Sequence, residues 1–380
     1  MKQGWEYKKL GEVCCPKNKI QRAARCFDSS DKILYIDISS IDNTIQKVTD
    51  ITSVTFGDAP SRAQQKIEYG DIVVSTVRPN LKNIAIIDRY EPNIVASSGF
   101  CVLRNTECIE RNYLFHYVTS DIFTQHLMKI TTGANYPAVR DQDVRDSIIP
   151  LPPKSTQLAI VSELDKINEL IRLKKEQLKD FDNLAQSIFY EMFGDPVENE
   201  KGWEVKKLVE VSSLINGRAY KQNELLNEGK YKVLRVGNFF TNSNYYYSNL
   251  ELDDEKYCYK GDLLFAWSAS FGAFIWDEGK TIFHYHIWRV LFDEKNLNIY
   301  YYKYLLNTMT NFFMNDVHGI GMVHLTKAGM EQYNLPLPPL PLQHLFAQRI
   351  EQIEHQKAEV QKSIADLETL LASRMQYWFE

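Results

Sequence analysis

The hydrophobic pattern in the middle of the chain predicts one long helix, from about Lys154 to Phe193. Apolar residues recur there alternately three and four positions apart, which keeps a narrow apolar seam on one side of a helix, as in a coiled coil. No Pro or Gly interrupts the run, and Lys174 occupies one position of the series. The seam consists of Leu164, Ile167, Ile171, Leu178, Phe181, Ala185 and Ile188.

A second version of this helix ends the chain, over residues 344–378. In it Lys357 stands where Ile171 falls in the first copy, and Val360 matches Lys174. Forty helical residues extend about 60 Å, which is longer than the width of a domain of about 150 residues. We therefore expect the two helices to pair with each other, antiparallel; the alternative is that each packs on its own domain. The second seam consists of Ile350, Ile353, Val360, Ile364, Leu367 and Leu371.

The globular parts of the chain are also repeated. GWEYKKLGEV (4–13) returns as GWEVKKLVEV (202–211), identical at eight of ten positions. IIPLPPKSTQ (148–157) returns as NLPLPPLPLQ (334–343), while the sequence between these ends diverges almost completely. We expect an α+β protein with an internal pseudo-twofold repeat, in which two similar globular domains are separated by an antiparallel two-helix coiled coil. The predicted boundaries are 1–153 and 197–339 for the domains and 154–196 and 340–380 for the helices.

Short β-branched segments predict the strands of both domains. The first domain has them at 33–39, 71–77, 83–88 and 99–104, followed by an amphipathic helix over 112–130. The second repeats this order with strands at 231–237, 262–268, 273–276 and 282–292 and a helix over about 300–313.

Composition and charge exclude several classes of protein. The chain has 380 residues, a net charge of −5 and no run of about 18 apolar residues, so we expect a cytoplasmic protein that does not enter the membrane. Its six cysteines form no CxxC pair, which favours reduced thiols. The net charge is +1 for residues 1–150, −3 for 151–198, −1 for 199–335 and −2 for 336–380. Charge alone thus gives no sign of nucleic-acid binding.

The sequence contains no recognisable catalytic motif. It has no Walker P-loop, no GxGxxG after a strand, no Asn/Asp-Pro-Pro-aromatic methyltransferase motif, no GxSxG and no HExxH. His284 and His286 would share one face of the predicted strand 282–292, but no further ligand suggests itself, so no metal is expected. These observations favour a protein that is not itself an enzyme.

The repeat and its motifs resemble the specificity subunit of type I restriction-modification systems. The resemblance rests on GWEYKKLGEV, on PLPP before each long helix, on SIFYEMFGDP (187–196) at the end of the first helix and on the repeated architecture. APSRAQQKIEYGDIVVSTVRPNLKNIA (59–85) also looks like a stretch common in first recognition domains of that family. One departure is that the second helix ends in SRMQYWFE, without the GDP tail.

The resemblance implies a DNA-reading subunit with two target recognition domains, each reading one half of a bipartite site in double-stranded DNA. The paired helices would fix the spacer between the halves and dock two methyltransferase subunits. Restriction subunits that translocate DNA would join these. S-adenosylmethionine, ATP and Mg would be bound by the partner subunits, and this chain would need no cofactor.

Candidate DNA contacts are polar side chains in the loops that follow strands and helices. In the first domain they are Arg62, Thr76, Arg78, Asn80, Lys82, Asn135, Tyr136 and Arg140. In the second they are Arg218, Tyr220, Lys221, Arg235, Asn238, Trp267, Ser268, His318, His324 and Lys327. Each is as readily explained as surface charge or a turn residue, and Trp267, on an apolar strand, is better explained as core.

Two other functions are compatible with the same pattern. One is a two-domain scaffold or adaptor that binds proteins rather than DNA, with the paired helices setting the distance between its binding sites. The other is a self-contained DNA enzyme, which the missing motifs disfavour.

Overall fold

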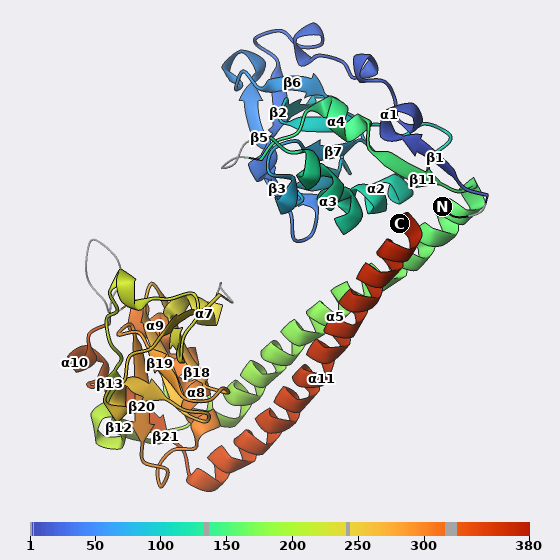
Figure 1. Cartoon of the computed structure of the whole chain (residues 1–380). Helices are drawn as coiled ribbons and strands as arrows, with labels where there is room; N and C mark the ends of the chain where they lie inside the picture. Colours follow the sequence, from blue (N-terminus) through green and yellow to red (C-terminus); the bar gives the residue numbers. More distant parts are fainter. Residues whose placement is uncertain (1, 3, 133–136, 241–243, 316–324) are drawn as a thin grey trace. The chain divides into compact units, whose positions relative to one another are not determined.

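A computed structural model of the chain describes residues 2, 4–132, 137–240, 244–315 and 325–380. The chain forms two compact units, residues 1–175 with 362–380 and residues 176–361 (Figure 1). The long helices α5 (Lys154–Phe193) and α11 (Leu340–Phe379) contribute residues to both. The predicted domain boundaries, which treat each helix as a separate element, stay a prediction.

The first unit is built around two sheets. One has the order β5 (Thr52–Thr55), β2 (Lys32–Ile36), β9 (Ile94–Ser97), β6 (Ala63–Lys66), and the other has β10 (Phe100–Leu103), β7 (Ile72–Ser75), β8 (Ile84–Ile86). Strands β2 and β9 are parallel, whereas the other pairs are antiparallel. A short antiparallel pair, β3 (Ile41–Asp42) and β4 (Lys47–Val48), lies beside them. The four predicted strands overlap β2, β7, β8 and β10.

The two motifs that begin and end each repeat pair with each other. In the first unit β1 (Glu6–Lys9) runs antiparallel to β11 (Ile148–Leu151) and leads into α1 (Leu10–Val13). In the second unit β12 (Glu204–Lys207) runs antiparallel to β21 (Asn334–Leu337) and leads into α6 (Leu208–Val211). The two repeated motifs therefore pair as strands in each globular part, directly before the long helix that follows it.

The predicted helix over 112–130 is two helices, α2 (Arg111–Thr119) and α3 (Asp121–Ile130). The break is at Ser120, which has extended dihedrals and whose hydroxyl accepts a hydrogen bond from the Phe123 amide. Serine favours this N-cap position because its side chain satisfies an amide that has no partner inside the helix. A further short helix, α4 (Asp141–Arg145), precedes β11.

The second unit is also built around two sheets, each of four strands. Its sheets have the orders β13 (Ser212–Asn216), β20 (Ile287–Phe292), β17 (Leu263–Ser268), β18 (Ser270–Ile275) and β15 (Tyr246–Ser248), β14 (Tyr231–Leu234), β19 (Thr281–Phe283), β16 (Tyr257–Cys258). Strands β14 and β19 are parallel, as β2 and β9 are in the first unit. The helices are α7 (Val236–Phe240), α8 (Ile299–Thr308), α9 (Thr310–Asn315) and α10 (Lys327–Met330).

Two elements predicted in the second domain are interrupted. The helix over 300–313 is divided into α8 and α9 at Met309. The strand over 282–292 is divided into β19 and β20 by a turn at 284–286. The expectation that strand alternation places His284 and His286 on one face is therefore wrong, because both residues lie in the turn.

The two long helices are antiparallel within each unit. In the first unit Glu163 of α5 accepts hydrogen bonds from Arg374 of α11, and the Lys175 ammonium lies 2.8 Å from Glu368. In the second, Lys357 of α11 lies 2.7 Å from Asp182 of α5. Of the predicted seam, Leu164, Ile167, Ile171, Ala185, Ile350, Ile353, Val360 and Ile364 are buried, and Leu178, Phe181, Ile188, Leu367 and Leu371 are half-buried.

The ends of both helices also contribute to the cores of the globular parts. Phe193 and Phe189 of α5 lie with ring centres 4.7 and 5.8 Å from that of Tyr301 on α8. Leu164 belongs to the core of the first unit together with Tyr113 and Phe123. Pairing between helices and packing on the domains, which the sequence presents as alternatives, therefore both occur.

A buried glutamine joins each globular part to its helix. Gln157 accepts from the Glu110 amide at 2.7 Å and donates to two carbonyl groups, including that of Pro152. Gln343 accepts from the Asn298 amide at 2.8 Å and donates to two carbonyl groups, including that of Pro338. Both come at the same place in the repeated PLPP motif. Within the described ranges, no helix combines the length and apolar character needed to cross a membrane.

Candidate nucleic-acid interface

Backbone hydrogen bonds in the first unit bring three of the predicted DNA-binding segments together. The Ser98 amide donates to the Arg62 carbonyl at 2.8 Å, and the amide and hydroxyl of Thr76 both donate to Gly99 at 2.9 Å. The Val139 amide in turn donates to Thr76 at 2.9 Å. Residues 62, 76–78 and 137–140, distant in sequence, therefore form one loop cluster.

The loop after β7 has an unusual backbone. Arg78 and Lys82 have φ of 50° and 51°, the left-handed region that residues other than glycine seldom adopt. They flank a 3-10 turn over Pro79–Leu81, and the Arg78 amide donates to Pro137 at 2.7 Å. Such strained loop residues concentrate at functional sites, and the turn leaves Asn80 exposed.

The predicted residues of this loop cluster differ in their solvent exposure and in the partners of their side chains. Arg62, Arg78 and Asn80 are exposed. Thr76 is 8% exposed and its hydroxyl is used on Gly99, so it positions the loop. The Lys82 ammonium lies 2.6 Å from Asp121, and the guanidinium of the exposed Arg140 lies 2.7 Å from Asp143, so both charges are already paired. Asn135 and Tyr136 lie outside the described residues.

The structure adds three cations that the sequence analysis missed. Lys19, Arg22 and Arg25 are exposed, and none of them forms a salt bridge within the described part of the chain. Arg22 forms a β-bridge with Gln65 of β6, which places this segment close to Arg62. Residues 16–25 contain four cations and no acid. This local excess of positive charge is not apparent in the net charge of residues 1–150. Exposed cations of this kind suit the phosphates of DNA.

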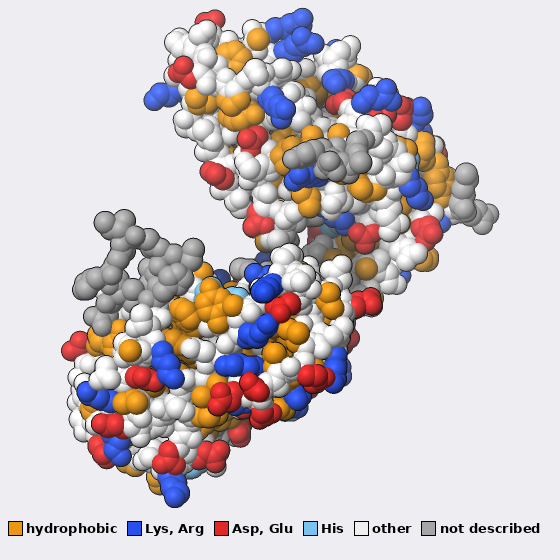
Figure 2. Space-filling view, turned by 60° about the vertical axis from the view of Figure 1, so that its left-hand side comes forward, with side chains coloured by type: hydrophobic (Ala, Val, Ile, Leu, Met, Phe, Trp, Pro, Cys, Tyr) orange, Lys and Arg blue, Asp and Glu red, His pale blue; other side chains and the backbone are white. Residues whose placement is uncertain are grey.

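The surface otherwise mixes charges of both signs. On the face shown in Figure 2, Lys and Arg side chains alternate with Asp and Glu over both units. A role in DNA binding would therefore rest on local groups of cations, such as those near Arg62, rather than on the overall charge.

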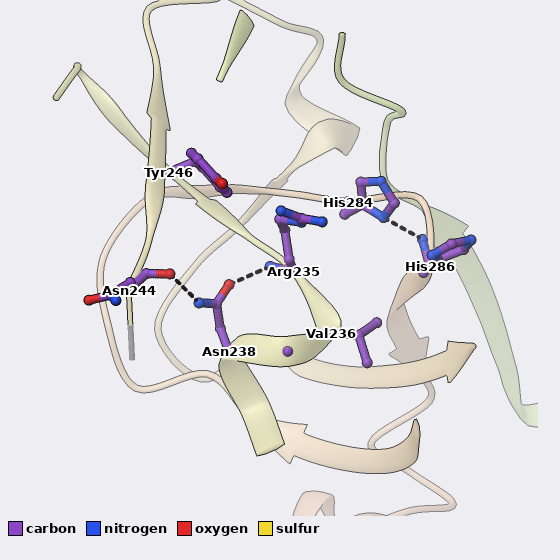
Figure 3. A pocket seen from close by; sticks show the side chains of 8 residues that line it. Arg235, Val236, Asn238, Asn244, Tyr246, His284 and His286 are labelled. Carbon is purple, nitrogen blue, oxygen red and sulfur yellow. Dashed lines mark hydrogen bonds between the residues drawn. The ribbon is translucent and has the colours of Figure 1, made fainter. Parts of the chain in front are cut away.

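In the second unit, predicted residues line a pocket with a volume of about 260 Å³ (Figure 3). Arg235 follows β14, and the side chain of Asn238 accepts from its amide at 2.8 Å and donates to the Asn244 carbonyl at 3.0 Å. Asn238 thus holds the loop that carries Arg235. The pocket is lined by Arg235, Val236, Gly237, Asn238, Asn244, Tyr246, His284 and His286.

The opposite wall of the pocket is the turn between β19 and β20. The His286 amide donates to the His284 imidazole at 3.4 Å. Trp267 donates from its indole to the Tyr285 carbonyl at 3.0 Å, and its ring stacks on Trp288 at 5.2 Å. Trp267, which is half-buried and packs against the core, therefore supports the turn. Ser268, at 2% exposure, is buried rather than available to DNA.

The pocket combines the Arg235 guanidinium with the rings of Tyr246, His284 and His286. The Arg235 guanidinium lies 5.4 Å from the ring centre of Tyr246. Burial, with the charges of His286 and Arg235, lowers the pKa of His284 to about 4, so this imidazole is neutral at pH 7. None of the described residues that line the pocket carries a carboxylate. Over the described ranges, no group of three or more His, Cys, Asp or Glu side chains is arranged to hold a metal ion.

The remaining predicted residues of the second unit lie outside this pocket. The Arg218 guanidinium makes two hydrogen bonds to Glu224, at 2.8 and 2.9 Å, and Tyr220 packs under it. Lys221 is exposed, and Lys327 lies 3.7 Å from Glu331. His318 and His324 lie outside the described residues.

The sites of the two units occupy equivalent places in the fold. Asp37 and Ser97 lie at the ends of the parallel strands β2 and β9, as Arg235 and His284 lie at the ends of β14 and β19. One backbone hydrogen bond is also common to both units. In the first unit the amide of Thr76, after β7, donates to the Gly99 carbonyl. In the second unit the amide of Trp267, on β17, donates to the His286 carbonyl at 3.1 Å. The two units thus present different side chains at the same edge of one framework.

The chain is thus a two-unit α+β protein in which one repeated framework carries two different sets of side chains at the same edge. Residues 2–180 and 200–369 match the family model described as type I restriction modification DNA specificity domain. The chain therefore belongs to this family, and the resemblance inferred from its motifs is confirmed. Each match covers one half of the internal repeat.

Individual relatives agree with this assignment. The HindI specificity subunit of Haemophilus influenzae is 24% identical over 194 residues, which are 50% of this chain and 41% of that subunit. The MjaIX specificity subunit of Methanocaldococcus jannaschii is 22% identical over 73% of this chain and 70% of its own. A chain from a solved structure on complex assembly and conformational transition of the type I R-M system is 28% identical, with a TM-score of 0.64, covering 100% of this chain and 98% of that one. The match to the HindI subunit thus spans less than half of that subunit's length.

Proposed function

We propose that this chain is the sequence-specific DNA-binding subunit of a type I restriction-modification complex and reads a bipartite site, one half with each unit. The observation that carries the proposal is the equivalent edge of the two units, which holds Asp37 in one and Arg235 in the other. Different side chains on the same framework suit two different half-site sequences. The family model, which matches both halves of the chain, supports the same role. It does not favour the alternative of a protein-binding scaffold.

The paired helices are proposed to set the spacer between the half-sites. Helices α5 and α11 each run for 40 residues and contribute to both units, so a change in their length changes the connection between the two readers. Within each unit their seams are largely buried against each other and against the globular part.

The outward faces of the helices are proposed to dock two methyltransferase subunits. In the first unit Leu158, Leu170 and Leu173 of α5 are 53%, 48% and 46% exposed, on the side of the helix away from Leu164 and Ile171. Exposed apolar residues grouped on one face mark protein interfaces. Methylation with S-adenosylmethionine, and ATP- and Mg-dependent translocation by restriction subunits, would then occur in the partners, and this chain would be non-catalytic.

The test is DNA methylation by the chain purified together with the methyltransferase subunit of its own system. We expect adenine methylation at one bipartite sequence, mapped by sequencing of methylated genomic DNA. A complex that methylates no bipartite site would refute the proposal. Exchanging residues 1–150 for another recognition domain should change one half-site and leave the other unchanged.

A second experiment separates the role of the helices from that of the units. Insertion of seven residues into both α5 and α11 preserves the seam, because seven residues are two helical turns. We expect a longer spacer between unchanged half-sites. Altered half-sites at an unchanged spacer would contradict the proposed role of the helices.

A further inference from the structure

The pocket of the second unit presents a guanidinium in a defined orientation. Arg235 is exposed, and none of the salt bridges among the described residues involves it. Its guanidinium lies 5.4 Å from the Tyr246 ring centre, and Figure 3 shows it between Tyr246 and His284. Asn238, hydrogen-bonded to the Arg235 amide and to Asn244, fixes the backbone beneath it. The loop thus holds a planar donor group at the mouth of a pocket.

The surroundings of Arg235 fit a neutral, planar ligand better than a phosphate. His284 is uncharged at pH 7, and the nearby Arg218 is neutralised by two hydrogen bonds to Glu224. The pocket therefore holds one guanidinium, paired with no described carboxylate, among aromatic and imidazole rings. A phosphate-binding surface instead gathers several cations, as the first unit does with Lys19, Arg22 and Arg25.

We propose that the pocket binds the major-groove edge of a guanine in the second half-site and that Arg235 donates two hydrogen bonds to its O6 and N7 atoms. Arginine is the side chain that most often recognises guanine in this way, because the spacing of its N–H groups matches the two acceptors. The inference rests on the proposed function and deepens it, since it names one base and the residue that reads it.

The equivalent place in the first unit supports a role in discrimination. There Asp37 follows β2 and presents a carboxylate, which accepts hydrogen bonds from Ser39. A carboxylate repels the acceptors O6 and N7 and suits a donor such as the amino group of cytosine. The two units therefore share the framework at this edge but carry different hydrogen-bonding groups there, an acceptor in the first unit and a donor in the second.

The test measures methylation of DNA duplexes by the complex of this chain with its methyltransferase. The duplexes carry each base in turn at every position of the second half-site. For the wild type we expect a strict requirement for one G·C pair. For Arg235→Ala we expect methylation of the preferred duplex to fall about 10- to 100-fold, with discrimination abolished at that pair and kept elsewhere.

Two further variants distinguish base reading from simple charge. Arg235→Lys keeps the positive charge but lacks the two-pronged donor group, so it should also fail to discriminate at that pair. Lys230→Ala, which removes an exposed lysine paired with Glu251 in the same unit, should leave every preference unchanged. First half-site preferences should be the same in all variants, which shows that the complex is intact.

The outcomes that overturn the inference are separate from those that overturn the proposed function. A second half-site without any G·C pair refutes the inference. So does an Arg235→Ala variant that keeps all its preferences, or one whose methylation falls equally on every duplex and is restored by Arg235→Lys, which indicates a phosphate contact. A wild-type complex that methylates no bipartite site refutes the proposed function instead.

Discussion

Lys357 of α11 lies 2.7 Å from the Asp182 carboxylate of α5, at a position where the corresponding residue of the first helix, Ile171, is buried in the seam. The Lys357 side chain is 18% exposed, and its ammonium also lies 3.3 Å from Glu354. Burial opposes the charge of Lys357, but the hydrogen bond to Asp182 and the charge of Glu354 raise its pKa above the ordinary value. The lysine therefore interrupts the apolar seam as a paired charge.

We expect the Lys357→Met variant to keep or increase the free energy of unfolding of the second unit, because a methionine fills the seam without a buried charge. Asp182→Asn should lower it by about 1 kcal/mol or less, since Asp182 is 63% exposed. Urea unfolding followed by tryptophan fluorescence reports mainly this unit, which holds four of the six tryptophans. Lys179→Met, at an exposed position of α5, is the control. A large decrease in stability in Lys357→Met would show that the ion pair stabilises the second unit.

Gln157 and Gln343 are the buried glutamines that join each globular part to its long helix. Replacement of either one should destabilise the unit that contains it. Gln343→Leu leaves the Asn298 amide and two carbonyl groups without partners and should lower the free energy of unfolding by about 1–3 kcal/mol. Gln157→Leu should do the same in the first unit. Gln356→Leu, at an exposed position of α11, should have little effect. Equal stability of Gln343→Leu and Gln356→Leu would contradict this role.

The cations near Arg62 should govern the salt dependence of DNA binding. Joint replacement of Lys19, Arg22 and Arg25 by Ala should reduce the slope of log K against log salt by about one unit for each phosphate that the variant no longer neutralises. The methylated sequence should not change, because phosphate contacts carry no direct base information. The measurement is binding by the complex at several salt concentrations.

The control for this experiment is the pair Lys8→Ala and Lys9→Ala. These lysines lie in the same unit but are paired with Glu6 and Asp146. We expect their removal to leave the slope unchanged. If the triple variant also keeps the slope of the wild type, residues 19–25 do not contact DNA.

The stability of the second unit should depend on pH through His284. The pKa of His284 is lowered from 6.5 to about 4 in the folded chain. As the pH falls below 6.5, the unfolded chain takes up a proton that the folded chain excludes, so stability decreases until the pH reaches about 4. His284→Gln removes this linkage. Its melting temperature relative to the wild type should therefore be higher at pH 5 than at pH 7.5, and a constant difference would contradict the assignment.

The features that depend on local pattern can be predicted from the amino-acid sequence. The apolar spacing predicts α5 over its full range of Lys154–Phe193, because the periodicity of a long helix is a local property. The repeated motifs predict two copies of one framework, and Gln157 and Gln343 fall at the same position of both. The first-unit strands β2, β7, β8 and β10 are also predicted, although each is shorter in the structure.

Local pattern is less informative where a side chain interrupts an element. Ser120 ends α2 because its hydroxyl caps α3, although the apolar periodicity continues through it. The turn at 284–286 lies in a sequence rich in strand-forming residues, and its position depends on the hydrogen bond from Trp267 to the Tyr285 carbonyl. The contact between Trp267 and Tyr285 joins two strands, and the Ser120 cap depends on one hydroxyl rather than on the spacing of apolar residues. Apolar periodicity therefore predicts neither of them.

The availability of the candidate side chains at the proposed interface depends on tertiary structure. The pairing of β6 with β9 brings Arg62 close to Ser98, and that of β14 with β19 brings Arg235 close to His284. The same folding neutralises Lys82 with Asp121 and Arg218 with Glu224 and leaves Arg22 and Arg235 unpaired by any described carboxylate. Local periodicity and repetition thus specify the framework. Strand pairing and charge pairing, which join residues far apart in the chain, determine where that framework presents its donors.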